Sequence, residues 1–236
     1  MQGISVVIPA LDEAPVIGLV VEKARGAALE VTQRVQVIVV DDGSSDGTGA
    51  VAAQAGAEVI RHRSNRGYGA ALRSGFAAAA LQWTFLVDGD DQFDPAELRL
   101  LVERADHADM IAGIRVHRSD NSLRRFGGRA WNRLCRVLFG DLGEDIDCAF
   151  KLIRTDLVQS LPLGASGAAI SVELFLGARA SGARVVQLPV SHFPRRHGRA
   201  SGVSLRVLAR ALVELIVLRV RGLSTGPVEA LEESSR

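Results

Sequence analysis

Residues 85–94 read FLVDGDDQFD, an apolar run that ends abruptly in four carboxylates and an amide. A strand this apolar is typical of a sheet interior that is buried on both faces, so its end delivers oxygen ligands to one sheet edge. Carboxylate and amide oxygens suit a divalent cation held against a diphosphate. The stretch therefore predicts a strand over residues 83–88 with a metal and phosphate site at its end, with a solvated acidic turn as the alternative.

Two earlier segments repeat this pattern. Residues 35–40 read VQVIVV and run into DDGSSDGT at 41–48, and the apolar run at 4–9 opens into ALDE at 10–13. In an open parallel α/β sheet, ligands bind beyond the carboxyl ends of the strands. We therefore expect the three strand ends to line one cleft.

The composition is that of an ordinary α/β domain, with 236 residues of which 47% are hydrophobic and 23% charged. The 28 Lys and Arg residues balance 27 Asp and Glu residues, which leaves no global field to attract nucleic acid. Cys135 and Cys148 are too few for a disulfide framework. Because a strand begins by the fourth residue, without a signal segment, we expect a cytoplasmic protein.

Strand and helix signals alternate through the first half, which predicts a mainly parallel sheet. Expected strands cover residues 4–9, 35–41, 57–61, 83–88 and 108–116, and expected helices cover 14–30, 47–56, 70–82 and 95–107. Beyond residue 116 the alternation weakens. There we expect a long basic helix at 122–139, an irregular strand at 146–153, a helix at 169–180 and a strand at 183–190.

Six short motifs follow one another along the chain. They are PALDE (9–13), VDDGSSDGT (40–48), NRGYGA (65–70), DGDDQ (88–92), DIDCAFK (145–151), and LPV (188–190) followed by Arg195 and Gly198. Together they resemble the family 2 glycosyltransferases of GT-A fold, and within them the polyprenyl-phosphate sugar synthases typified by dolichol-phosphate mannose synthase. The resemblance covers residues 4–201.

The resemblance implies a single Rossmann-like α/β domain over residues 1–201, with a mainly parallel sheet flanked by helices. Residues 1–116 would bind a nucleoside-diphosphate sugar and residues 117–201 the acceptor, with inverting transfer of the sugar and Mg²⁺ or Mn²⁺ as cofactor. The nucleotide-sugar contacts it implies are Pro9, Leu11, Glu13, Val40, Asp42, Asp88, Gly89 and Asp90. The metal ligands it implies are Asp90 and Gln92.

The resemblance also implies catalytic and acceptor-binding residues. The catalytic set is Asp88, Asp90, Asp145 and Arg115, and the set that binds the acceptor or its phosphate is Arg115, Lys151, Arg195 and Arg199. A departing nucleoside diphosphate develops negative charge that a metal ion and arginines neutralise. A phosphate acceptor is already anionic, so it needs no strong general base.

Two places depart from the family pattern. The loop after Arg195 commonly ends Gly-x-Ser-Lys, whereas residues 198–201 read GRAS, so Arg199 is the candidate replacement for the lysine. Leu11 and Asp12 stand where Tyr and Asn are usual, which leaves the identity of the base open. Three functions stay open: sugar transfer to a lipid phosphate, transfer to a soluble acceptor, and a nucleotidyltransferase or nucleotide-sugar-binding module. The third is disfavoured because residues 9–13 lack a glycine-rich basic loop.

The C-terminal segment predicts an amphipathic helix over residues 202–223, with apolar residues at helical spacing and four arginines against one glutamate. A spanning helix would place Arg210 near the bilayer centre, at a cost of about 2.5–3.5 kcal/mol for that arginine. We therefore expect the helix to lie on the inner face of the cell membrane, or to pack within the core or a homodimer. Residues 224–236 predict a flexible acidic tail.

Overall fold

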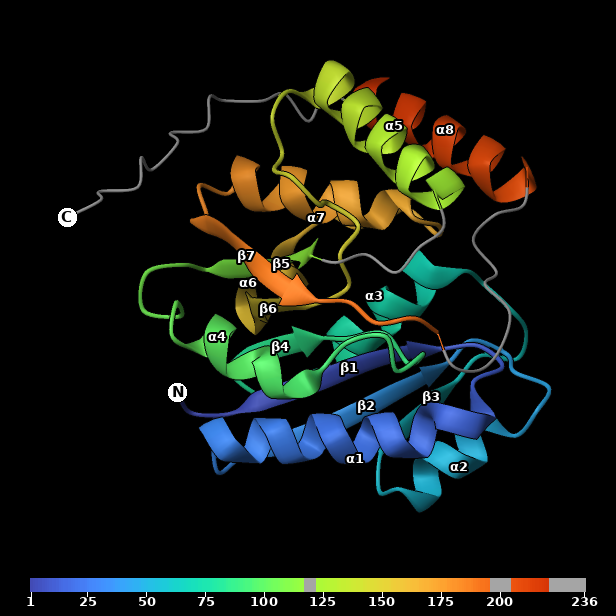
Figure 1. The fold of residues 1–236 in the computed structure, drawn as a ribbon, viewed down its shortest axis with the longest axis vertical. Coiled ribbons are helices and arrows are strands. Elements are labelled where there is room, and N and C mark those ends of the chain that lie inside the picture. Colours follow the sequence, from blue (N-terminus) through green and yellow to red (C-terminus); the bar gives the residue numbers. More distant parts are fainter. Residues whose placement is uncertain (117–121, 196–204, 221–236) are drawn as a thin grey trace.

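The computed structural model describes residues 1–116, 122–195 and 205–220 (Figure 1). Within them, seven strands form one sheet in the order β3-β2-β1-β4-β6-β5-β7. β6 runs antiparallel to both of its neighbours, and every other neighbouring pair is parallel. The strands are β1 (Ile4–Ala10), β2 (Val35–Asp41), β3 (Glu58–Arg61), β4 (Trp83–Leu86), β5 (Met110–Val116), β6 (Lys151–Arg154) and β7 (Val185–Ser191).

Helices cover both faces of this sheet. On one face lie α1 (Ala14–Val31), α2 (Thr48–Gln54), the 3-10 turn η1 (Pro95–Glu97) and α4 (Leu98–Val102). The other face carries α3 (Tyr68–Ala78), α6 (Thr155–Ser160) and α7 (Ala169–Ala180), with α5 (Ser122–Phe139) and α8 (Leu205–Val220) packed beyond α7. The expected α/β architecture, mainly parallel and flanked by helices, is confirmed.

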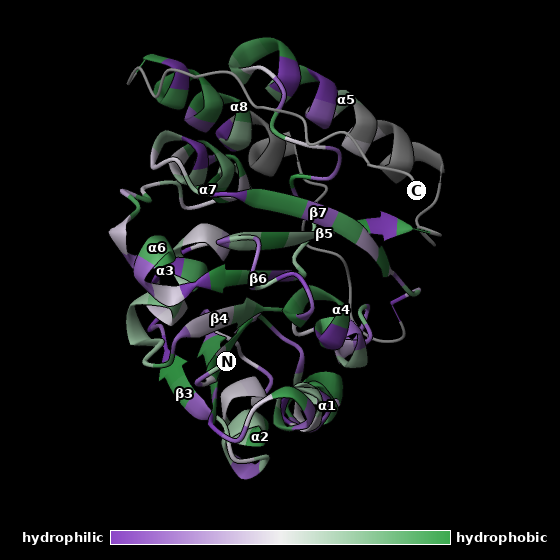
Figure 2. Ribbon diagram, turned by 90° about the vertical axis from the view of Figure 1, so that its left-hand side faces the viewer, coloured by the Kyte–Doolittle hydropathy of each residue, from purple (hydrophilic) through white to green (hydrophobic). Residues whose placement is uncertain are grey.

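The continuous apolar runs of the central strands reflect burial on both faces. Every residue of β1 is buried. Val6 and Ile8 join the core under α1, whereas Val7 between them joins the core under α3, because successive side chains of a strand point to opposite faces. Figure 2 shows the hydrophobic colour running along the strands.

Two expected elements differ most in extent from those observed. The expected helix at 95–107 is a 3-10 turn followed by the short α4. The expected strand at 146–153 is reduced to β6, because the Lys151 ammonium donates to the carbonyls of Ile146 and Cys148 and folds that segment back. The six residues of α6 are too few for a periodic signal, and we did not expect a helix there.

The last described helix, α8, lies beside α5 at one end of the molecule (Figure 1). Its residues Ala211, Leu215 and Leu218 are buried. Among the described residues, no helix is both long and apolar enough to cross a membrane. The expected tail at 224–236 lies outside the described residues.

Candidate functional site

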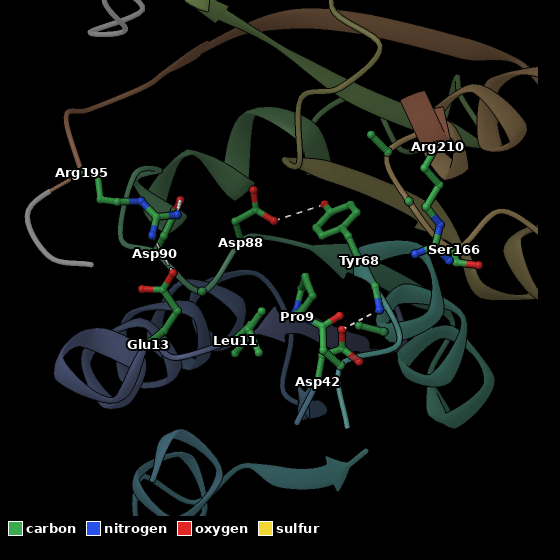
Figure 3. A pocket seen from close by; sticks show the side chains of 17 residues that line it. Pro9, Leu11, Glu13, Asp42, Tyr68, Asp88, Asp90, Ser166, Arg195 and Arg210 are labelled. Atoms are coloured by element: carbon green, nitrogen blue, oxygen red, sulfur yellow. Dashed lines mark hydrogen bonds and ion pairs between the residues drawn. The ribbon is translucent and has the colours of Figure 1, made fainter. Parts of the chain in front are cut away.

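A cavity of about 470 Å³ opens at the carboxyl ends of β1, β2 and β4 (Figure 3). Its volume lies within the range of small-molecule sites. Seven of the eight expected nucleotide-sugar contacts line it: Pro9, Leu11, Glu13, Asp42, Asp88, Gly89 and Asp90. Because the strands are parallel, their ends meet at one sheet edge, and three distant motifs form one site.

Val40, the eighth expected contact, does not line the cavity. It is fully buried on β2 and faces α3, where a Cβ added to Gly75 would lie 3.2 Å from its Cγ2. Its neighbour Asp42 follows the strand end and does reach the cavity. The structure therefore does not place the side chain of Val40 at the cavity wall, because it packs in the core under α3, before the end of β2.

Asp42 organises one wall of the cavity. Its Oδ1 lies 2.6 Å from His62 Nδ1 and accepts a hydrogen bond from Arg66 N at 2.9 Å, while its Oδ2 accepts one from Gly67 N at 2.8 Å. These bonds hold the loop that precedes α3 against the end of β2. Asp42 therefore shapes the wall in addition to lining the cavity.

Asp88 lies at the centre of the cavity and is paired with Tyr68, whose hydroxyl donates to Asp88 Oδ1 at 3.2 Å. Burial and the nearby Asp90 carboxylate together raise the pKa of Asp88 to about 7, although Tyr68 and Arg115 act to lower it. Burial and the same Asp88 also raise the pKa of Tyr68. Tyr68 belongs to the NRGYGA motif, but no role at the site was predicted for it.

Asp90 and Glu13 share the guanidinium of Arg195. Arg195 Nη2 donates to Asp90 Oδ2 and Arg195 Nη1 donates to Glu13 Oε1, each at 2.7 Å. Burial raises the pKa of Glu13, and Arg195 lowers it. Because two carboxylates converge on one guanidinium, this end of the cavity is suited to bind a positively charged group.

The carboxylates of Asp90 and Glu13 fit a divalent cation. Mg²⁺ is commonly bound by one or two carboxylates together with substrate phosphates. In the part of the chain that the structure describes, no group of three or more His, Cys, Asp or Glu side chains is arranged to hold a metal ion alone. Phosphate oxygens of a nucleotide would therefore have to complete the coordination of a metal bound here.

Gln92, the other expected metal ligand, is not among the lining residues. Its Nε2 donates to the carbonyl of Phe193 at 2.9 Å, and its backbone N donates to Asp90 Oδ1 at 3.2 Å. The structure thus places Gln92 as a link between the acidic loop and the segment that carries Arg195. Asp91, the residue after Asp90, forms an ion pair with Lys23.

Arg115 and Asp145 form a pair with each other behind the cavity. The guanidinium of Arg115 donates from Nε and Nη2 to the two oxygens of Asp145 at 2.8 and 2.7 Å, and Arg115 N adds a bond at 3.1 Å. Neither residue is among the lining residues of the cavity. The structure therefore does not place Arg115 or Asp145 at the cavity wall, where a phosphate-binding or catalytic role would put them.

Lys151 does not line the cavity either. Its side chain is 1% exposed and donates to the two backbone carbonyls of the preceding loop, and burial lowers its pKa. A cation in this position supports the fold of the DIDCAFK segment instead of meeting a surface acceptor. Its charge still lowers the pKa of Asp88.

Part of the wall built by the second half of the chain was not predicted from the sequence. Ser166, Gly167 and Ala168, just before α7, and Arg210 on α8 line the cavity. No motif marks them, because they come from a loop and from a helix whose arginines look alike in the sequence. Arg199, an expected acceptor-binding residue, lies outside the described residues.

The fold and the cavity define an α/β protein of the GT-A class, with acidic strand ends around one nucleotide-sized site. Residues 5–161 match the model of the family described as Glycosyl transferase family 2, and the chain belongs to that family. It is therefore a glycosyltransferase. Membership of this family also excludes the alternative that the protein is a nucleotidyltransferase.

Relatives of known name support this assignment. The chain is 28% identical over 238 residues to the undecaprenyl-phosphate 4-deoxy-4-formamido-L-arabinose transferase of Edwardsiella ictaluri (strain 93-146), covering 98% of this chain and 71% of that protein. It is 29% identical over 214 residues to the enzyme of the same name from Pseudomonas aeruginosa (strain LESB58), covering 87% of this chain and 62% of that protein.

The fold is shared with solved structures. Glucosyl-3-phosphoglycerate synthase from Mycobacterium tuberculosis, in complex with Mn²⁺, UDP and glucosyl-3-phosphoglycerate, superposes with a TM-score of 0.72 at 21% identity, covering 92% of this chain and 80% of that chain. Its complex with Mn²⁺ and UDP-glucose gives a TM-score of 0.71 at 20% identity. These similarities confirm the GT-A fold.

Proposed function

We propose that this protein transfers a sugar from a UDP-sugar to the phosphate of a polyprenyl phosphate, with inversion at the sugar and with Mn²⁺ or Mg²⁺ as cofactor. The observation that carries the proposal is the cavity in which Asp42, Asp88 and Asp90 meet at one sheet edge. The names of the relatives supply the acceptor, and the titles of the solved structures supply UDP and Mn²⁺.

The acidic end of the cavity gives the donor diphosphate its place. A cation held by Asp90 and Glu13 would neutralise the two phosphates as the leaving group forms. Arg195, already within reach of both carboxylates, would move its charge onto phosphate oxygen when the cation takes its position. The acceptor phosphate is anionic and attacks without a strong base.

The outer side of α8 supports a lipid acceptor. Its apolar side chains Val213, Ile216 and Val220 are 60%, 60% and 79% exposed. Val137 on the adjacent α5 is 76% exposed. Apolar groups on a basic helix are typical of contact with the surface of an anionic membrane. We propose that this face contacts the inner face of the cell membrane, and a homodimer through the same face is the alternative.

A soluble phosphorylated acceptor is the second candidate. It is favoured by the similarity to glucosyl-3-phosphoglycerate synthase, solved in complex with phosphoglyceric acid. Both acceptors carry a phosphate group, so the cavity described above suits either of them. The apolar outer face of α8 favours the lipid, because a small soluble acceptor gives that face no partner.

Product mass tests the donor and acceptor together. Purified protein is incubated with UDP-, GDP- and dTDP-sugars and Mn²⁺, with polyprenyl phosphate or with 3-phosphoglycerate. We expect a glycosylated polyprenyl phosphate from a UDP-sugar. Transfer to 3-phosphoglycerate alone would favour the soluble acceptor, and no transfer from any donor would contradict the proposal.

Sedimentation with vesicles tests the membrane contact. Vesicles that contain phosphatidylglycerol should pull down the protein at low salt, and Ile216→Ser should weaken that binding. Arg210 is unsuitable for this test because it lines the cavity. Leu19→Ser on α1 is a matched control, since Leu19 is also an exposed apolar residue, at 45%, but on another helix. Wild-type protein that stays in the supernatant would argue for the homodimer.

A further inference from the structure

A side chain from the C-terminal helix reaches the cavity. Arg210 lies at the end of the cavity opposite Arg195 (Figure 3). The next residue, Ala211, is buried, as is Leu215 one turn later. Packing of α8 against α7 therefore sets the position of Arg210.

Glu214 holds Arg210 and the loop before α7 together. Its Oε1 accepts hydrogen bonds from Ser166 N at 3.0 Å and Gly167 N at 3.2 Å, and it lies 3.4 Å from Arg210 Nε. A Cβ added to Gly167 would lie 3.0 Å from Glu214 Oε2, so the glycine permits this approach. Glu214 is thus a positioning residue for the guanidinium.

The guanidinium of Arg210 stands over the loop that Asp42 holds. A Cβ added to Gly67 would lie 3.8 Å from Arg210 Nη1, and Gly67 N is bonded to Asp42. Among the described residues Glu214 is the ion-pair partner of Arg210, whose side chain is still 54% exposed. Donor groups of the guanidinium therefore remain accessible to a ligand in the cavity.

The order of groups along the cavity indicates which part of the nucleotide-sugar donor lies next to Arg210. With the cation and diphosphate at Asp90 and Arg195, the ribose falls near Asp88 and the base falls at the Asp42 end. In a pyrimidine nucleotide, ring position 4 lies opposite the atom that carries the ribose. The end wall of the cavity, where Arg210 lies, therefore faces the group at position 4.

Resting on the function proposed above, we infer that Arg210 is a specificity-determining residue that donates a hydrogen bond to the carbonyl oxygen at position 4 of the donor's pyrimidine base. A guanidinium only donates hydrogen bonds. Uracil presents a carbonyl at position 4, whereas cytosine presents an amino group there. The amino group would face the guanidinium of Arg210, and two hydrogen-bond donors cannot bond each other. Sites that hydrogen-bond one group discriminate strongly against an analogue that lacks it.

Calorimetric titration with UDP and CDP, in the presence of Mn²⁺, tests this inference on wild-type protein and on Arg210→Met. Wild-type protein should prefer UDP. In the variant, UDP should bind roughly tenfold to a hundredfold more weakly, as expected for loss of a hydrogen bond from a charged group, while CDP binding changes little. Arg219→Met is the matched control, because Arg219 is an exposed arginine on the same helix that does not line the cavity.

The outcomes separate the inference from the proposed function. Equal losses for UDP and CDP, or unchanged UDP binding, would overturn the assignment to position 4. Wild-type protein that binds no nucleoside diphosphate would contradict the proposed function instead. Arg210→Lys keeps the charge without the fork, so it should retain part of the preference for UDP, and it serves if Arg210→Met does not fold.

Discussion

The two halves of the chain build the cavity in different ways. In residues 1–116, the carboxylates that line the cavity come just after the ends of parallel strands, as Asp42 follows β2 and Asp88 follows β4. In the second half, the contributors are Ser166, Arg195 and Arg210, from two loops and a helix. The charged residues of the DIDCAFK segment in that half bind away from the cavity instead: Asp145 pairs with Arg115 of the first half, and Lys151 bonds backbone carbonyls. A charged motif is therefore better evidence of a site when a parallel strand ends at it.

The largest expected effect tests the first half. Asp90→Asn should lower sugar transfer about a thousandfold, on the order of 4 kcal/mol, because the cation is needed most as the leaving group forms. Transfer rates and melting temperatures are measured together. Asp91→Asn is the control, since Asp91 bonds Lys23. Near-normal activity of Asp90→Asn would show that Asp90 is not a ligand of the metal.

The next effect tests the ion pair between Arg115 of the first half and Asp145 of the second half. Arg115→Met should lower the free energy of unfolding by about 3 kcal/mol, because it leaves a buried carboxylate without its guanidinium. Urea unfolding measures this loss, and Arg184→Met, which removes a more exposed ion pair with Asp109, should cost less than about 1 kcal/mol. A variant of full stability that lacks activity would instead restore Arg115 to a phosphate-binding role.

A smaller effect concerns the contact between the halves. Arg195 neutralises Glu13 and Asp90, so it competes with a cation for the same oxygens. Arg195→Gln should therefore bind Mn²⁺ alone roughly tenfold more tightly, about 1.4 kcal/mol, as measured by electron paramagnetic resonance without nucleotide. Lys23→Gln should leave the affinity unchanged. Equal or weaker Mn²⁺ binding by Arg195→Gln would show that the guanidinium does not compete.

The smallest effect concerns Asp147, whose Oδ1 is buried without a hydrogen-bond partner among the described residues. Burial raises its pKa to about 6. Between pH 4 and 6 the folded state retains a proton that the unfolded state releases, so stability falls as pH rises and levels off above the folded pKa. The Asp147→Asn variant has no carboxyl group at this position, so its stability lacks this fall with pH.

Thermal unfolding at pH 4.5, 6 and 7.5 checks this. The stability of Asp147→Asn relative to wild type should rise with pH by on the order of 1 kcal/mol, since one pKa unit corresponds to about 1.4 kcal/mol. Asp141→Asn, at an exposed carboxylate, should follow wild type. A difference between Asp147→Asn and wild type that is independent of pH would mean that Asp147 stays ionised in the folded state.

The sequence by itself determined the first half of the fold and most of its site. The apolar runs at 4–9, 35–40 and 85–87 predicted buried parallel strands, and the acidic residues after them predicted one cleft at their ends. This works because strand periodicity and the parallel arrangement are local signals that fix where a strand end points.

The helices at 122–139 and 169–180 were also predicted from the sequence, but only the tertiary structure decided which charged side chains reach the cavity and which pair elsewhere. Arg115 and Asp145 lie 30 residues apart, and their ion pair depends on how β5 and the loop before β6 come together. Arg210 resembles its neighbouring arginines in sequence, and it reaches the cavity because α8 packs on α7 with Ala211 and Leu215 facing inward. Charged side chains find partners through space, so their sequence context predicts their charge but not what they contact.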